Sequence, residues 1–233
     1  MLAQTGFRYS DDKRDLTISA QNGGGKPIPQ GWKLDLLRNV SIASQLQKFT
    51  LKADKVTVDI ASTKGSTSAN EVKTATASGK VKIVQRADLR SSNIQSNQAT
   101  YRSLGKTAQV DLRGSVYIES IDEKKNQTLV ATGSSGTATL DKEAKNTSGL
   151  RQAILNGPVQ IEVDQAGSEG STMLFKGNKL TLSPGKAVLS GNVSADGRGK
   201  NKIGSFTNMD TLTVILNERN EMKSFAFSSG KVK

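Results

Sequence analysis

Apolar residues recur at every second position in many stretches of this chain, which is the period of a β-strand. Around Gly157, for example, Leu155, Val159 and Ile161 share one parity, and polar residues such as Gln160 occupy the other. Each such stretch predicts a strand with one apolar face and one polar face. We therefore expect an all-β chain without a substantial helix.

A five-residue motif recurs within these stretches, and its clearest copy is Leu189-Ser190-Gly191-Asn192-Val193. The third residue of the motif falls at positions 38, 79, 114, 157 and 191. This spacing indicates an array of about five related units, each roughly 40 residues long. A second alternating stretch follows in each unit, so each unit supplies at least two strands that need neighbours to cover one apolar face.

Four of the five motif copies carry glycine at the third position, on the inward parity. Glycine at a matching position in successive strands indicates a bend or a close approach of the backbone. A change of parity between Ala53 and Val56 predicts a turn or bulge near Asp54-Lys55, and Pro158 predicts an edge or a bulge. The valines that follow the motif centres should point into one interior: Val40, Val81, Val116, Val159 and Val193.

The chain divides into an N-terminal segment, residues 1–31, and a single β domain, residues 32–233. In the segment we expect a short strand at Leu16–Ile18 and a flexible loop at Asn22–Pro27, because three glycines and a proline disfavour a strand interior. The domain should end in a strand around Phe225–Phe227. Further turns or loops are expected at 63–70, 122–126, 141–149 and 217–220.

Composition changes this picture by limiting what fills the interior. Only 34% of the 233 residues are hydrophobic and 4% are aromatic. The space between the sheet layers must therefore be thin and filled by Val, Ile, Leu and Ala, which suggests an open or flattened arrangement.

The chain contains no Cys and no His, and this excludes several kinds of chemistry. Disulfides, thiolate catalysis, His-based triads and His-dependent metal sites are all ruled out. Carboxylates remain, but Asp122-Glu123 lies in a predicted turn and Glu162 lies on the outward parity of its strand. Because no two carboxylates are placed in one cleft, we expect no enzymatic activity, no metal site and no cofactor.

The net charge of +12 predicts attraction to a polyanionic partner. Nucleic acid is disfavoured as that partner, because no basic run exceeds two residues and few aromatic residues are available for stacking. An alternative is that scattered lysines keep exposed strand edges from pairing with other chains. The stretch Met1–Thr5 lacks the apolar core of a signal peptide, so we expect any signal or anchor to be absent from this chain.

Two stretches resemble a known repeat. Asn97-Gln98-Ala99-Thr100-Tyr101, with Gly114-Ser115-Val116 after it, is similar to the OstA-like repeat of the periplasmic lipopolysaccharide-transport family of LptA and LptC. Gly177-Asn178-Lys179-Leu180-Thr181-Leu182, followed by Ala187 to Val193, resembles it more closely. The resemblance covers roughly residues 36–216. Arg38 departs from it, since the family pattern favours glycine there.

The resemblance implies a twisted, open antiparallel β-jellyroll built from about five OstA-like units, and a periplasmic location. It implies a non-enzymatic carrier or bridge that moves lipopolysaccharide, or a similar acidic glycolipid, towards the outer membrane. Its partners would be the lipid and other jellyroll transport proteins joined through strand edges, or a second copy of the chain. The acyl chains would lie in a groove lined by Ile42, Val58, Val81, Ile83, Tyr101, Val116, Ile118, Leu140, Val159, Ile161, Leu182, Val193 and Val214.

Two other interpretations stay open at this point. A structural β-solenoid or edge-to-edge assembly module would share the repeat but fill its interior completely and bind no lipid. A generic module for acidic ligands or nucleic acid would depend on the net charge alone, and its binding would fall steeply with salt.

Overall fold

The computed structural model describes residues 6–11, 16–29, 31–45, 48–61, 71–143, 150–165, 171–199, 204–216 and 222–229. Within these ranges the regular structure is entirely β, and all strands belong to one open antiparallel sheet. The strands are β1 (Phe7–Asp11), β2 (Leu16–Ala20), β3 (Asn22–Ile28), β4 (Gly31–Ser44), β5 (Phe49–Ala61), β6 (Glu71–Ala87), β7 (Arg90–Leu104), β8 (Thr107–Asp122), β9 (Gln127–Asp141), β10 (Leu150–Gln165), β11 (Ser171–Ser183), β12 (Lys186–Gly199), β13 (Ser205–Leu216) and β14 (Met222–Ser229).

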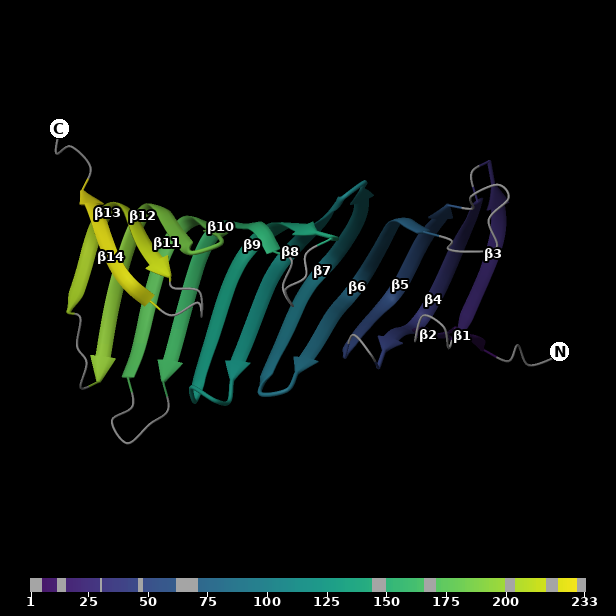
Figure 1. Ribbon diagram of the computed structural model, residues 1–233, viewed down its shortest axis with the longest axis horizontal. Coiled ribbons are helices and arrows are strands. Elements are labelled where there is room, and N and C mark those ends of the chain that lie inside the picture. The colour runs from purple at the N-terminus through teal and green to yellow at the C-terminus, as the bar shows by residue number, and fades with distance from the viewer. Residues whose placement is uncertain are drawn as a thin grey trace.

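From β4 to β14 each strand pairs with the next one along the chain, so the sheet is a meander (Figure 1). The N-terminal end differs, because β2 and β3 both pair with β4, on its two halves. β1 then pairs with the outer edge of β2. The sheet therefore includes the strands of residues 1–31 together with those of the rest of the chain.

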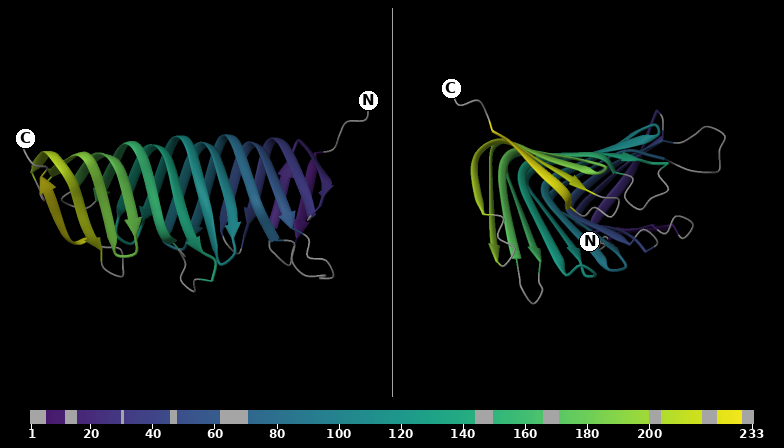
Figure 2. Two further views of the ribbon diagram at one scale, coloured as in Figure 1. Left: turned by 90° about the horizontal axis from the view of Figure 1, so that it is seen from above. Right: turned by 60° about the vertical axis from the view of Figure 1, so that its left-hand side comes forward.

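The sheet folds over along a line of bulges, which we call the crease (Figure 2). The pairing register shifts near the middle of each strand from β4 to β12, as between Arg113 and Val116 of β8. The bulges that the sequence predicts near Asp54 and Pro158 are confirmed. Positive φ angles occur in the even-numbered strands at Arg38, Asn39, Gly79, Lys80, Gly114, Ser115, Gly157, Gly191 and Asn192.

The crease divides the sheet into two walls. Wall A contains strand segments such as Val116–Asp122 of β8, and wall B contains segments such as Thr107–Arg113 of the same strand. The two walls splay apart on the side away from the crease, which we call the mouth (Figure 2). β14 pairs with the wall B half of β13, whereas β1 and β2 extend wall A at the other end.

Glycines at the crease make room for polar side chains of the neighbouring strand. A Cβ atom added to Gly79 would lie 2.8 Å from the Cβ of Asp54. A Cβ atom added to Gly157 would lie 2.7 Å from the Cβ of Ser134. Because real Cβ atoms do not approach so closely, the strands can meet here only when one of them lacks a side chain.

The most deeply buried side chains lie along the crease. The five valines that the sequence places in one interior all belong to a single buried cluster, which confirms that prediction. The largest side chains in it with almost no exposure are Leu36, Val40, Val56, Val81, Val116, Val159 and Val193. Each bulge adds one residue to an even-numbered strand relative to its neighbour, so Leu112 and Val116, four residues apart on either side of the bulge, both point inward.

The predicted loop at Asn22–Pro27 is wrong, because these residues form most of strand β3. β3 is the edge strand of wall B, where a proline removes no hydrogen bond from a second neighbour. Its glycines allow close packing: a Cβ atom at Gly25 would lie 3.0 Å from Leu34. The predicted short strand near Leu16, the turn after Asp122 and the last strand around Phe225 are all confirmed. The predicted loops at 63–70 and 217–220, and most of 141–149, lie outside the described residues.

Candidate functional site: an apolar groove with charged rims

The space between the walls is apolar and becomes more exposed with distance from the crease. On β8, Val116 is fully buried, but Ile118 is only partly buried. The same step occurs on wall B of β11, from Leu180 to Leu182. Some inward residues at the depth of Ile118 or further from the crease are nevertheless buried: Ile18, Val58, Ala108, Ala131, Val163 and Ala195. Apolar side chains that face each other and remain partly exposed form a groove, since a closed core would bury them.

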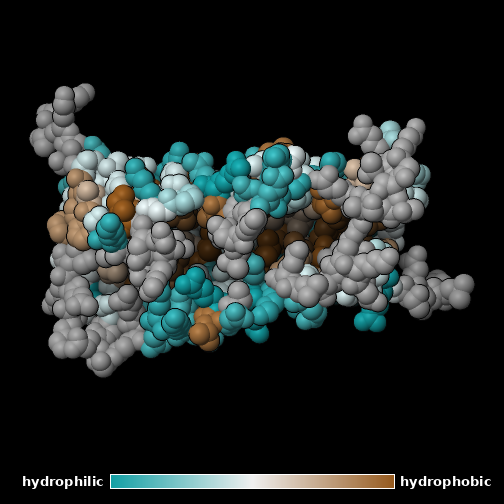
Figure 3. Space-filling view, viewed as in Figure 1, coloured by the Kyte–Doolittle hydropathy of each residue, from teal (hydrophilic) through white to brown (hydrophobic). Residues whose placement is uncertain are grey.

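The groove runs along the length of the molecule. Figure 3 shows apolar surface in a hollow that follows the long axis, between hydrophilic surfaces above and below it. The partly buried apolar residues that pack against the core belong to both walls, as Ile83 of wall A and Val110 of wall B illustrate. The visible part of the hollow is therefore apolar, with apolar side chains on both walls.

The structure places the thirteen residues predicted to line a groove at different depths. Val58, Val81, Val116, Val159 and Val193 belong to the buried cluster at the crease. Six further residues pack against that cluster and are partly buried: Ile42, Ile83, Ile118, Ile161, Leu182 and Val214. Tyr101 and Leu140 are partly buried outside the cluster, on the inward parity of wall B, as the pairing of Tyr101 with Val110 and of Leu140 with Ala108 shows.

The C-terminal end of the groove carries an aromatic cluster that the sequence analysis did not identify as part of the site. The rings of Phe206 and Phe227 stack with centroids 4.8 Å apart, and Phe225 meets Phe227 edge-on at 5.2 Å. A small apolar pocket beside these rings is also lined by Phe175 and Met173. The alternation of Phe225 and Phe227 was a usable signal, but only the folded sheet brings β11, β13 and β14 together here.

Hairpin turns form a rim along the open side of each wall, and ion pairs connect neighbouring turns. On wall A, the Lys48 ammonium lies 3.0 Å from the Asp88 carboxylate, and Arg90 lies 2.9 Å from Asp122. The hydrogen bond from Lys48, together with its positive charge, lowers the pKa of Asp88. These contacts link the turns after β4, β6 and β8 in a row along the molecule.

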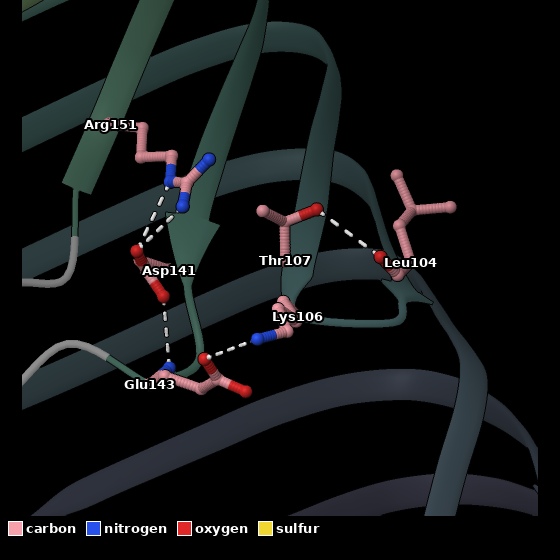
Figure 4. A network of polar contacts seen from close by, with 6 residues as sticks. All are labelled: Leu104, Lys106, Thr107, Asp141, Glu143 and Arg151. Atoms are coloured by element: carbon pink, nitrogen blue, oxygen red, sulfur yellow. Dashed lines mark hydrogen bonds and ion pairs between the residues drawn. The ribbon is translucent and has the colours of Figure 1, made fainter.

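On wall B, the turn between β7 and β8 meets the segment that joins β9 to β10 (Figure 4). Lys106 lies 3.3 Å from Glu143, and the Arg151 guanidinium lies 2.8 Å from Asp141. Hydrogen bonding by Arg151 is the main reason why the pKa of Asp141 is lowered. Both rims are therefore polar structures with defined charge contacts, and they border an apolar hollow.

The outer faces of the walls carry hydrogen-bonded carboxylates. Asp111 of β8 accepts hydrogen bonds from Gln109 at 2.8 Å and from Thr137 at 3.0 Å, and it pairs with Arg102. Burial opposes the ionisation of Asp111, but these contacts outweigh it, so its pKa is lowered. Glu162 is exposed on the outer face of β10. Within the described ranges no group of three or more His, Cys, Asp or Glu side chains is placed to hold a metal ion.

In the part of the chain that the structure describes, no helix is long and apolar enough to cross a membrane. Comparisons of the chain with protein-family models, with curated proteins and with solved structures find no match.

Proposed function

We propose that this protein is a non-enzymatic lipid carrier or bridge that moves lipopolysaccharide, or a similar acidic glycolipid, through the periplasm to the outer membrane. The observation that carries the proposal is the gradient of burial across the groove. Inward apolar residues such as Ile118 and Leu182 are partly exposed on two facing walls. Covering them with acyl chains would stabilise the complex by roughly 25 cal/mol for each Å² removed from water.

The charge on the rims suits an acidic headgroup. Lys106 and Lys186 lie in or beside turns of wall B, at the edge of the apolar hollow. Phosphate oxygens accept charge-assisted hydrogen bonds from such side chains. An amphiphile with several acyl chains and phosphorylated sugars would match both parts of the site, with its chains between the walls and its phosphates at the rim.

The sequence resemblance supports the same function. The crease follows the motif positions, and the bulges there turn a flat meander into a two-walled sheet, as expected of an open β-jellyroll made of about five OstA-like units. The periplasmic location and the association with other jellyroll proteins belong to the proposal on the same ground.

Photo-crosslinking to purified lipopolysaccharide tests the proposal directly. A photoreactive residue is placed at Ile118, Ile161 or Leu182, which are partly exposed inside the groove. Glu162 is the matched control, because it is adjacent to Ile161 in the chain but is exposed on the outer face of the same strand. Crosslinks at the three inward positions and none at Glu162 are expected. Equal labelling at Glu162, or no labelling at the inward positions, would contradict a lipid groove.

A second candidate function is edge-to-edge assembly without a lipid cargo. The observation that favours it is at the C-terminal end, where β14 pairs with β13 along one edge and its other edge has no partner among the described strands. Phe225 on this strand is 42% exposed. An open strand edge is a template for pairing with another chain.

A further inference from the structure

The two rims differ in their balance of charge. We compare the described residues that lie in a turn or within two residues of a strand end. Among residues whose side chains are described, wall A carries Lys48, Arg86, Arg90, Lys124, Lys125 and Arg198 against Asp88, Asp122, Glu123 and Asp164, a small basic excess. On wall B the basic excess is larger: Lys26, Lys33, Lys73, Arg102, Lys106, Lys142, Arg151, Lys186 and Lys223 against Asp59, Asp141 and Glu143.

The wall B rim also carries large apolar side chains that are about half exposed. Leu104, at the turn between β7 and β8, is 54% exposed, and Trp32, at the start of β4, is 48% exposed. Leu104 lies between Arg102 and Lys106 in the chain, and Trp32 precedes Lys33. Apolar tips flanked by basic residues are typical of surfaces that enter the interface of an anionic membrane.

We propose that the wall B rim docks on the surface of an anionic phospholipid bilayer. In this orientation Trp32 and Leu104 enter the interface, and the basic residues beside them contact lipid phosphates. The mouth of the groove then opens at the membrane surface, so a lipid enters sideways over the rim and not through the ends of the sheet. Only this last step rests on the proposed lipid-carrier function.

The wall A rim provides a natural comparison. Leu89, in the turn between β6 and β7, is 52% exposed, which is close to the value for Leu104. Its surroundings differ, because Leu89 lies between Asp88 and Arg90 in the chain, and the backbone N–H of Glu123 donates a hydrogen bond to its carbonyl oxygen. The acidic groups near Leu89 would oppose contact with an anionic surface, since like charges repel there.

Trp32 is the only tryptophan of the chain, so it reports docking without any substitution. The intact protein is mixed with vesicles of phosphatidylcholine alone, or with vesicles that also contain phosphatidylglycerol, and no glycolipid is added. We expect a blue shift of the tryptophan emission, and quenching by brominated acyl chains, only with the anionic vesicles. Unchanged emission with anionic vesicles, or an equal shift with neutral ones, would overturn the proposal.

Paired substitutions assign docking to one rim. Leu104→Ser should weaken binding to anionic vesicles, measured by cosedimentation, whereas Leu89→Ser should leave it unchanged. Lys26→Gln combined with Lys33→Gln should weaken binding by about fivefold for each charge removed, and more at low salt. The matched pair on wall A, Arg86→Gln with Lys124→Gln, should have a much smaller effect. Equal losses from the two rims would overturn the assignment to wall B.

Two controls keep the result independent of folding and of the lipid-carrier proposal. Each variant is checked for an unchanged urea unfolding midpoint, and a variant that is destabilised is replaced by Leu104→Gln or Lys223→Gln at the same rim. Crosslinking at Ile118 with detergent-dispersed lipopolysaccharide is measured separately. A variant that loses vesicle binding but keeps crosslinking has a docking defect alone. Vesicle binding without any crosslinking would support docking and would contradict the proposal that the groove binds lipid.

Discussion

At the scale of single residues, the crease depends on backbone conformations that few side chains tolerate. Gly79 has a φ of 75° and Gly114 a φ of 72°, both in the left-handed region. Arg38 adopts a φ of 62° at the equivalent place on β4, where the other four copies of the motif carry glycine. A left-handed residue with a Cβ atom costs roughly 1–2 kcal/mol, so the packing of the crease must offset that cost at Arg38.

Comparing Gly79 with Gly105 separates the energetic cost of a left-handed backbone from the cost of a steric collision at the crease. Both have a similar positive φ, but a Cβ atom at Gly105 would meet nothing within 4 Å, whereas one at Gly79 would collide with Asp54. Gly105→Ala should lower the free energy of unfolding by about 1–2 kcal/mol. Gly79→Ala should lower it by a further 1–3 kcal/mol, roughly, because the crease becomes overpacked.

Urea denaturation of the two variants and the unaltered chain measures this difference. Both variants should keep the far-ultraviolet circular dichroism of a β protein. Equal losses for the two would mean that the close approach between β5 and β6 contributes nothing to stability.

At the scale of strands, side-chain hydrogen bonds on the outer face connect strands that are adjacent in the meander. Asp111 of β8 joins β7 through Arg102 and β9 through Thr137. Other carboxylates act across a single pair of strands, as Asp35 does by accepting a hydrogen bond from Thr57 at 2.8 Å. The polar face thus reinforces the same pairing that the buried face requires.

The lowered pKa of Asp111 predicts a contribution to stability that depends on pH. Because this pKa is lower in the folded state, the contribution is fully present above the unfolded-state value of about 4, and it is lost as the pH falls through the folded-state value. Unfolding by urea at pH 6 and at pH 3 should show a smaller difference for Asp111→Asn than for the unaltered chain. The same difference in both proteins would exclude Asp111 as a source of acid sensitivity.

At the scale of the whole molecule, the fold is a row of strands that contact mainly their neighbours in the sheet. Such an arrangement has no closure at its ends, unlike a barrel. The C-terminal end presents β14, and the N-terminal end presents β1 on wall A and β3 on wall B. The ends therefore supply surfaces for assembly, and the long mouth supplies a surface for ligands.

The open edge of β14 predicts association of the chain with itself. Light scattering should show a mass that rises with protein concentration. Ala226→Pro should abolish that rise, because proline lacks the backbone donor that edge pairing needs. Ala226→Thr is the control, since threonine favours strands and keeps the donor. A mass that does not depend on concentration in the unaltered chain, or that is unaffected by the proline, would contradict assembly through this edge.

The sequence by itself determined the strands, the inward valines and the positions of the crease. These are local properties: alternation sets which face a residue occupies, and a change of parity marks a bulge near Asp54. The absence of His and Cys likewise limited the chemistry before any fold was known.

Only the tertiary structure decided that Asn22–Ile28 is a strand, because consecutive glycines have no side chains to show a parity and the edge of β4 supplies their pairing. The tertiary structure also decided that the interior is open towards the mouth and that one rim is more basic than the other. Those properties depend on where the sheet folds and on which turns then lie along the same side, and no local pattern contains that information.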